Sequence, residues 1–251
     1  MTHCIAKLAI FALVCSVSVF GQKRTIDLAS YDYLPFNGQS LKESGAITKL
    51  TVMVFEKAGY TVKVTNHNEP WARILSMAKG GEFDALVSIW ESKDRDPYMA
   101  TTDATMNNEV GFAKLKADTM AASNLHEVAD LNVNIGTVRG YAQPKALSTV
   151  KLTFDEADND GALVAKLMAG RDRLILTDKA VAAYYANKLG SGAATKLQWL
   201  FTVESLPLRT GIVKTGKADW QDVVKDYDNA LAALQKEGTV NKVIREYGLK
   251  F

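Results

Sequence analysis

The chain has 251 residues, 47% of them hydrophobic, and its 30 lysines and arginines nearly balance its 28 aspartates and glutamates. The two signs of charge are interspersed, and no basic run could hold a phosphate backbone, which disfavours nucleic acid as a partner. Both cysteines, Cys4 and Cys15, lie near the amino terminus, so the rest of the chain has no disulfide framework and no thiolate metal site.

The first 21 residues have the layout of a secretory signal. Lys7 is followed by a short apolar stretch that begins at Leu8 and ends near Gly21. This stretch is shorter than the roughly 20 apolar residues that a membrane-spanning helix needs. The alternatives to a cleaved signal are that the segment stays in the membrane as an anchor, or that the protein is a lipoprotein with its lipid on Cys15. We expect residues 1–21 to be removed and the mature, cysteine-free chain to be a monomer in a bacterial periplasm.

Strands and amphipathic helices alternate along the first ninety residues. The order strand, helix, strand, helix, strand indicates a mostly parallel sheet with helices on both faces. The expected strands are 25–31, 60–65 and 83–89, and the expected helices are 47–58 and 70–80.

A second run of the same type follows. We expect strands at 109–115, 133–138, 151–154, 173–177, 197–203 and 208–213, with a turn at Pro207 between the last two. Helices are expected at 143–148, 161–169, 178–189, 220–236 and 240–247. The periodicity is compatible with two separate units, and equally with two crossing strands and C-terminal helices that return to the first unit. In either case, ligands of open α/β sheets bind beyond the carboxyl ends of the strands.

Catalytic and metal signatures are absent from the sequence. The three histidines, His3, His67 and His126, are scattered and form no zinc-binding pair. There is neither a Gly-x-Ser-x-Gly elbow nor a phosphate-binding Gly-rich loop. We therefore expect no metal and no cofactor, and we interpret the charged residues at strand ends as recognition groups.

Several candidate residues stand directly after strands of the first unit. Tyr33 is placed to stack on a ligand or, as the alternative, to pack against its neighbours in the loop. Ser88, Trp90 and Arg95 follow the buried strand 83–89. A guanidinium matches a carboxylate and forms charge-assisted bonds worth roughly 1.5–3 kcal/mol each. Taken alone, Arg95 could equally be a surface cation paired with Asp94 or Asp96.

The second unit offers candidates in the same position. Gly140 and Tyr141 end a strand and open a helix, whose free amide groups would attract an anion. Asp178 begins a helix directly after a strand. It is either a common N-cap aspartate or a carboxylate that meets a ligand ammonium.

Together these segments resemble the family 3 extracellular solute-binding proteins, the receptors of polar amino acid uptake systems. Tyr33 to Phe36 is similar to the family's aromatic-x-Pro-Phe segment, and Arg95 stands where the family has its carboxylate-binding arginine. The other matching segments are Trp71 to Asp84, Leu167 to Asp178, and the closing helix pair from Lys236 to Gly248.

The resemblance implies a two-lobed α/β fold of the periplasmic-binding-protein type, with two mixed sheets flanked by helices and joined by two crossing strands. Lobe one would comprise residues 22–110 and 212–251, and lobe two residues 111–211. The crossings would lie near 109–114 and 205–212. The resemblance also implies a receptor that closes on a small carboxylate, with Asp178 on the amino group, and serves an inner-membrane permease of the ABC type.

The sequence also departs from the family pattern. Residues 45–50 lack the two usual acids, Trp90 replaces a hydroxyl, and Tyr141 and Ala142 stand where small hydroxylated residues are usual. We therefore expect aromatic walls formed by Tyr33, Trp71, Trp90 and Tyr141. Arg73 is either a second anion contact or a solvated helix residue. A cyclohexadienyl-dehydratase-like enzyme and a ligand-sensing module are the alternative functions.

Overall fold

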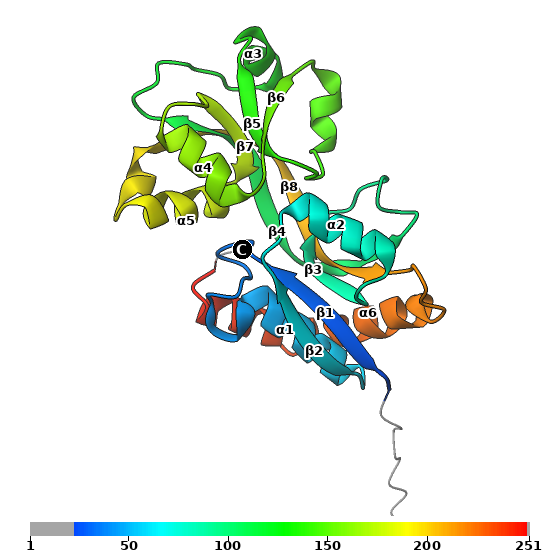
Figure 1. Ribbon diagram of the computed structural model, residues 1–251. Coiled ribbons are helices and arrows are strands. Elements are labelled where there is room, and N and C mark those ends of the chain that lie inside the picture. Colours follow the sequence, from blue (N-terminus) through cyan, green and yellow to red (C-terminus); the bar gives the residue numbers. More distant parts are fainter. Residues whose placement is uncertain (1–22, 250–251) are drawn as a thin grey trace, which may run out of the picture.

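The computed structural model describes residues 23–249, which form one mixed sheet of eight strands in the order β2-β1-β3-β8-β4-β7-β5-β6 (Figure 1). The expected secretory segment, residues 1–21, lies outside the described residues. The strands are β1 (Thr25–Tyr31), β2 (Thr61–His67), β3 (Ala85–Ile89), β4 (Met99–Leu115), β5 (Asn134–Val138), β6 (Thr153–Ala157), β7 (Leu174–Asp178) and β8 (Leu197–Val213). The helices are α1 (Ala46–Lys57), α2 (Trp71–Gly80), α3 (Leu125–Asp130), α4 (Asp160–Met168), α5 (Lys179–Leu189), α6 (Trp220–Lys236) and α7 (Thr239–Glu246).

The expectation of two separate sheets is wrong, because β4 and β8 run through both halves of the molecule. Each strand has 17 residues, and they pair antiparallel from Met99↔Val213 to Leu115↔Leu197. Strands of this length extend roughly 55 Å. The β1–β3 strands join this ribbon at one end and the β5–β7 strands join it at the other, so its hydrogen bonds continue from one half into the next.

Pro207 does not form the expected turn but lies inside β8, opposite Asn107. At this point the ribbon has no third strand beside it, because β3 pairs with β8 only as far as Arg209 and β7 reaches β4 only at Val110. A proline is tolerated where a strand has an unpaired side, since its missing N–H then removes no ladder bond.

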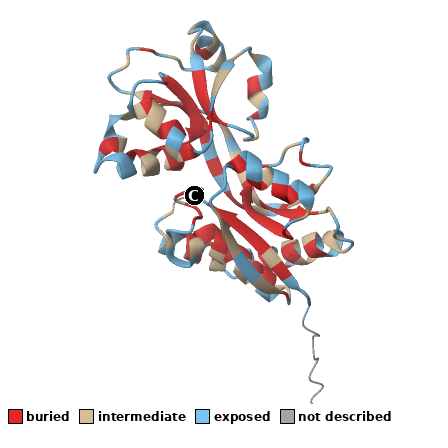
Figure 2. Cartoon of the chain, in the orientation of Figure 1, coloured by how far each residue is buried: buried red, intermediate tan, exposed pale blue. Residues whose placement is uncertain are grey.

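Helices cover the two halves separately (Figure 1). Helix α1 packs against α6 and α7, which brings the end of the chain back to the β1–β3 half. In α6 the buried positions recur at helical spacing: Val223, Tyr227, Ala230, Leu231 and Leu234. Figure 2 shows the buried residues along the strands and the inward sides of the helices. None of the helices between residues 23 and 249 is long and apolar enough to cross a membrane.

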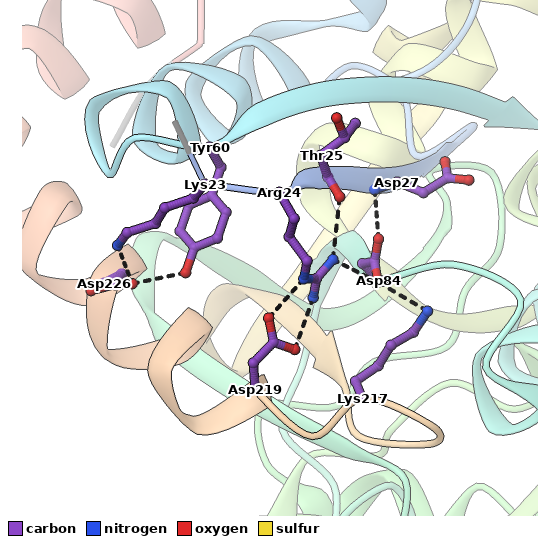
Figure 3. A network of polar contacts seen from close by, with 9 residues as sticks. All are labelled: Lys23, Arg24, Thr25, Asp27, Tyr60, Asp84, Lys217, Asp219 and Asp226. Carbon is purple, nitrogen blue, oxygen red and sulfur yellow. Dashed lines mark hydrogen bonds and ion pairs between the residues drawn. The ribbon is translucent and has the colours of Figure 1, made fainter. Parts of the chain in front are cut away.

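A polar network fastens the first described residues to the β1–β3 half (Figure 3). The side chain of Arg24 forms ion pairs with Asp219, at the start of α6, and with Asp84, just before β3. Asp84 also pairs with Lys217 at 3.0 Å and accepts the backbone N–H of Asp27 at 2.8 Å. This network holds β1 against β3 and so helps to place the loops that follow both strands.

Candidate functional site

The loops at the carboxyl ends of β1 and β3 face the other half of the molecule and enclose a small cavity. Six of the nine predicted site residues line it. The lining residues are Tyr31, Tyr33, Trp71, Ser88, Trp90, Arg95, Tyr141 and Ala142. The first six come from the β1–β3 half or its loops, and the last two follow β5. The cavity is therefore formed between the two halves.

This cavity has a volume of about 10 Å³, which is space for about one water molecule. Aromatic side chains fill the remaining space. The ring centroids of Trp90 and Tyr141 are 5.7 Å apart, those of Trp71 and Tyr141 5.8 Å, and those of Tyr33 and Trp90 6.3 Å. The halves are thus in direct contact, and a ligand of amino acid size requires them to separate or the rings to move.

Arg95 is a buried cation whose guanidinium is held by backbone carbonyl oxygens. Its side chain is 5% exposed and stacks over the Trp71 ring, with 5.4 Å between Cζ and the ring centroid. Its guanidinium donates to the carbonyl oxygens of Trp90 at 2.6 Å and Gly140 at 3.2 Å. No carboxylate among residues 23–249 lies within ion-pair distance of it, so the pairing with Asp94 or Asp96 does not occur. Burial accordingly lowers the pKa of Arg95.

Ser88 is held in a strained conformation beside this cavity. Its φ of 54° lies in the left-handed region, which non-glycine residues rarely adopt. Its hydroxyl donates to Oδ1 of Asn37, and its carbonyl accepts the hydroxyl of Tyr31 at 2.7 Å. The Ser88 hydroxyl is therefore already used inside the protein, and these bonds position the loop that carries Trp90 and Arg95.

Asp178 is the N-cap of α5, which is one of the two interpretations that the sequence left open for this residue. Its Oδ1 accepts the backbone N–H groups of Ala180 at 2.8 Å and Val181 at 3.0 Å. Its Oδ2 accepts Nδ2 of Asn108 at 2.9 Å. Burial nevertheless raises the pKa of Asp178 to about 6. The carboxylate does not line the small cavity. It is nevertheless near the Tyr33 hydroxyl, whose pKa is raised mainly by burial and also by the charge of Asp178.

Several buried polar atoms in the cleft and beside Asp178 lack hydrogen-bond partners in the described part of the chain. Among them are Tyr33 Oη, Trp90 Nε1, Asn108 Oδ1 and Thr177 Oγ1. An unsatisfied buried polar group costs about 1–3 kcal/mol. Such groups call for an explanation wherever they occur in a folded protein, and a bound molecule is one.

Two expectations about this region need correction. The segment 143–148 is not an α-helix, because a single 3₁₀ turn, η2 (Lys145–Thr149), begins only after Pro144. The N–H of Tyr141 donates to the carbonyl of Val138 at 3.1 Å. No helix start therefore presents free amides at Tyr141, and Gly140 offers a carbonyl instead. Arg73 is exposed on α2 and does not line the cavity.

Several residues of the cleft were not identified as site residues from the sequence, among them Tyr31, Asp160 and Tyr185. Tyr31 is the last residue of β1 and is buried, and Asp160 begins α4, three positions after β6 ends. Asp160 and Asp178 both lie where a strand leads into a helix, although Asp178 is the N-cap of α5 and Asp160 is the first residue of α4. That repeated strand-end position was the available signal.

Comparisons with known proteins agree with this geometry. The sequence profile of the bacterial extracellular solute-binding proteins, family 3, matches residues 28–250. No curated protein sequence gives a match.

The fold is similar to many solved structures. An ancestral arginine-binding protein bound to arginine has a TM-score of 0.73 at 17% identity, over 90% of this chain and 99% of that one. A histidine kinase sensor domain similar to periplasmic binding proteins has a TM-score of 0.75 at 16% identity, over 90% of this chain and 96% of that one. A periplasmic binding protein of the His/Glu/Gln/Arg/opine family from Silicibacter pomeroyi, in complex with lysine, has a TM-score of 0.68 at 14% identity. The match covers 88% of this chain and 96% of that one. These similarities show the periplasmic-binding-protein fold.

Proposed function

Because the chain belongs to the family 3 bacterial extracellular solute-binding proteins, we propose that it is a receptor that captures a small carboxylate between its two halves. The observation that carries this proposal is Arg95, a buried guanidinium in the interlobe cavity with no carboxylate partner among the described residues. A buried charge is stable when it is paired, and a ligand carboxylate would supply the pair.

Binding at Arg95 would couple directly to movement of the two halves. Arg95 belongs to the loop after β3, whereas Gly140, whose carbonyl it contacts, follows β5 in the other half. A ligand carboxylate would replace this carbonyl and bring a full negative charge to the guanidinium, which forms stronger, charge-assisted bonds. Contacts from the same ligand to both halves would then stabilise the closed state.

The other end of the ligand would lie toward Asp178. We assign the ligand's ammonium to this carboxylate and its hydrophobic surface to Tyr33, Trp71, Trp90 and Tyr141. The unpartnered hydroxyl of Tyr33 and the unpartnered indole N–H of Trp90 support a polar ligand there. The small volume and the scarcity of free hydroxyls favour a ligand bound mainly by charge and by ring stacking.

A thermal-shift screen of amino acids and organic acids tests the proposal. A ligand at 100 times its dissociation constant adds about 2.7 kcal/mol of stability. We expect the wild type to be stabilised by at least one carboxylate, and Arg95→Ala to lose this stabilisation. Arg139→Ala is the matched control, because Arg139 lies on the surface and its ion-pair partners among the described residues are Glu156 and Asp158. A carboxylate that stabilises Arg95→Ala as much as wild type would refute the assignment.

The proposed setting is the periplasm, where the receptor would deliver its ligand to an inner-membrane ABC permease. The similarity to a histidine kinase sensor domain supports sensing as a second candidate. A strain that lacks the gene for this protein separates these roles. Its uptake of the identified ligand, measured as growth, and its transcription in the presence of the ligand are compared with those of the parent strain. Loss of uptake indicates a permease partner, and loss of a transcriptional response indicates a kinase.

A further inference from the structure

A second and larger cavity lies between the two halves, next to the Arg95 cavity. Its volume is about 240 Å³, and it shares the side chains of Tyr31, Trp71 and Tyr141 with the smaller one. Three carboxylates line it: Asp32, Glu69 and Asp160. No lysine or arginine between residues 23 and 249 lines it, so the surface that these residues form is acidic. We call this cavity the acidic chamber.

Asp160 is the most deeply buried carboxylate of the acidic chamber, with 2% of its surface exposed. Its Oδ2 accepts the hydroxyl of Tyr141 at 2.6 Å, and its Oδ1 has no partner among residues 23–249. No cation of the described chain forms an ion pair with it. Acidic residues are common in the first turn of a helix, but a position in α4 does not require burial. Its burial at the chamber wall therefore needs another explanation.

The charges around the chamber are mostly negative, although the Arg95 cation in the neighbouring cavity partly offsets them at Tyr31. Burial, and secondarily the charge of Asp178, raise the pKa of Asp160 to about 7. The negative charge of Asp160 in turn adds to the effect of burial in raising the pKa of Tyr31 and Tyr185. The other titratable group at the wall is His67, whose Nδ1 lies 3.3 Å from Glu69 Oε2. A cation inside the chamber would relieve this repulsion.

The walls of the chamber also have the chemistry that organic cations prefer. Four aromatic rings line it together with the carboxylates, those of Tyr31, Trp71, Tyr141 and Tyr185. Ring faces attract ammonium and guanidinium groups with about 0.5–2 kcal/mol each. Trp71 belongs to one half of the molecule, whereas Asp160 and Tyr185 belong to the other. A cation bound here would therefore contact both halves.

We propose that the acidic chamber binds a cationic side chain of the ligand, with Asp160 as its principal partner. This inference rests on the proposed function, because it places the carboxylate of the same ligand at Arg95. The shared wall of Tyr31, Trp71 and Tyr141 makes the two cavities neighbours. The ligand class is then an amino acid or related carboxylate whose side chain ends in an ammonium or guanidinium group.

Isothermal titration with L-arginine and L-citrulline tests this inference on the full chain. Citrulline has nearly the same shape as arginine but an uncharged ureido group. We expect wild type to bind arginine at least tenfold more tightly than citrulline, and Asp160→Asn to remove this preference. The asparagine oxygen still accepts the Tyr141 hydroxyl, and the melting temperature reports whether the variant is folded. Asp158→Asn, which removes an exposed carboxylate paired with Arg139, should retain the preference.

The outcomes separate this inference from the proposed function. If Asp160→Asn binds arginine as wild type does, or if wild type binds no cationic amino acid, the chamber is not a cation site. A neutral or acidic carboxylate that binds wild type and fails to bind Arg95→Ala would then leave the proposed function intact. Loss of arginine binding in Arg95→Ala together with loss of the arginine preference in Asp160→Asn supports both assignments.

Discussion

The indole Nε1 of Trp71 donates a hydrogen bond of 3.0 Å to the carbonyl oxygen of Gly140. Trp71 is the first residue of α2, and Gly140 follows β5, so this bond joins the two halves of the molecule. The same carbonyl accepts the Arg95 guanidinium. Gly140 therefore serves as the contact that holds the cleft closed around Arg95.

Trp71→Phe should shift the protein toward an open form, because it removes the donor and keeps a ring in place. A neutral hydrogen bond contributes about 1 kcal/mol, equivalent to roughly a fivefold change in the ratio of closed to open forms. We expect a larger radius of gyration by small-angle X-ray scattering. Trp199→Phe is the matched control, since Trp199 Nε1 bonds to Thr202 within the same strand. Equal radii for Trp71→Phe and wild type would show that this bond does not hold the halves together.

Asp160→Asn should stabilise the ligand-free protein most at alkaline pH. The pKa of Asp160 is raised from its ordinary 3.8 to about 7, so the folded wild type is destabilised when this carboxyl must ionise. This loss of stability is absent at low pH, grows as the pH rises above about 4, and is complete above 7. From pH 5 to pH 8, the variant should gain roughly 3 kcal/mol over wild type. Urea denaturation at both values measures this gain, and Asp158→Asn should show none. A constant difference between Asp160→Asn and wild type across this range would contradict the buried-carboxylate assignment.

Asp178 caps α5, and different substitutions separate this role from the proposed binding of a ligand ammonium. Asparagine caps α3 and α4 in this chain, so Asp178→Asn should keep the cap of α5, and Asn108 can turn its free Oδ1 toward the new amide. Asp178→Ala should lose about 1–2 kcal/mol of stability. If Asp178 binds an ammonium, Asp178→Asn should lose ligand affinity at nearly wild-type stability. Calorimetric titration and chemical denaturation of both variants measure the two effects, and unchanged affinity in Asp178→Asn would leave only the cap.

The polar network at the start of β1 should be sensitive to Asp84 and insensitive to Asp219. Asp84→Asn weakens two ion pairs and a bond to the Asp27 amide at a largely buried position, and we expect a loss of about 2–3 kcal/mol. Asp219 is 43% exposed, so Asp219→Asn should cost less than about 1 kcal/mol. Urea unfolding compares the two variants. Equal losses would mean that burial does not strengthen the Asp84 contacts.

Most elements could be predicted from the sequence because their signals are local. The apolar spacing of α6 and the glycines that end α1 and α2 depend only on neighbouring residues, and the observed ends lie within about three residues of those expected. The exceptions include α3, which was not expected, the segment 143–148, which forms a 3₁₀ turn, and above all β4 and β8. Their pairing across the two halves joins residues about a hundred positions apart, and Pro207, normally a turn signal, lies inside a strand there.

Sequence alone determined the family resemblance and singled out Arg95, because a charged residue after a buried strand is visible in one dimension. Tertiary structure decided what that arginine contacts. Whether a cation has a counter-ion depends on which distant groups fold against it, and here they are the carbonyl oxygens of Trp90 and Gly140. The same reason explains why the acidic chamber could not be foreseen: Asp32, Glu69 and Asp160 come from three separate segments, and only the folded chain brings them to one cavity.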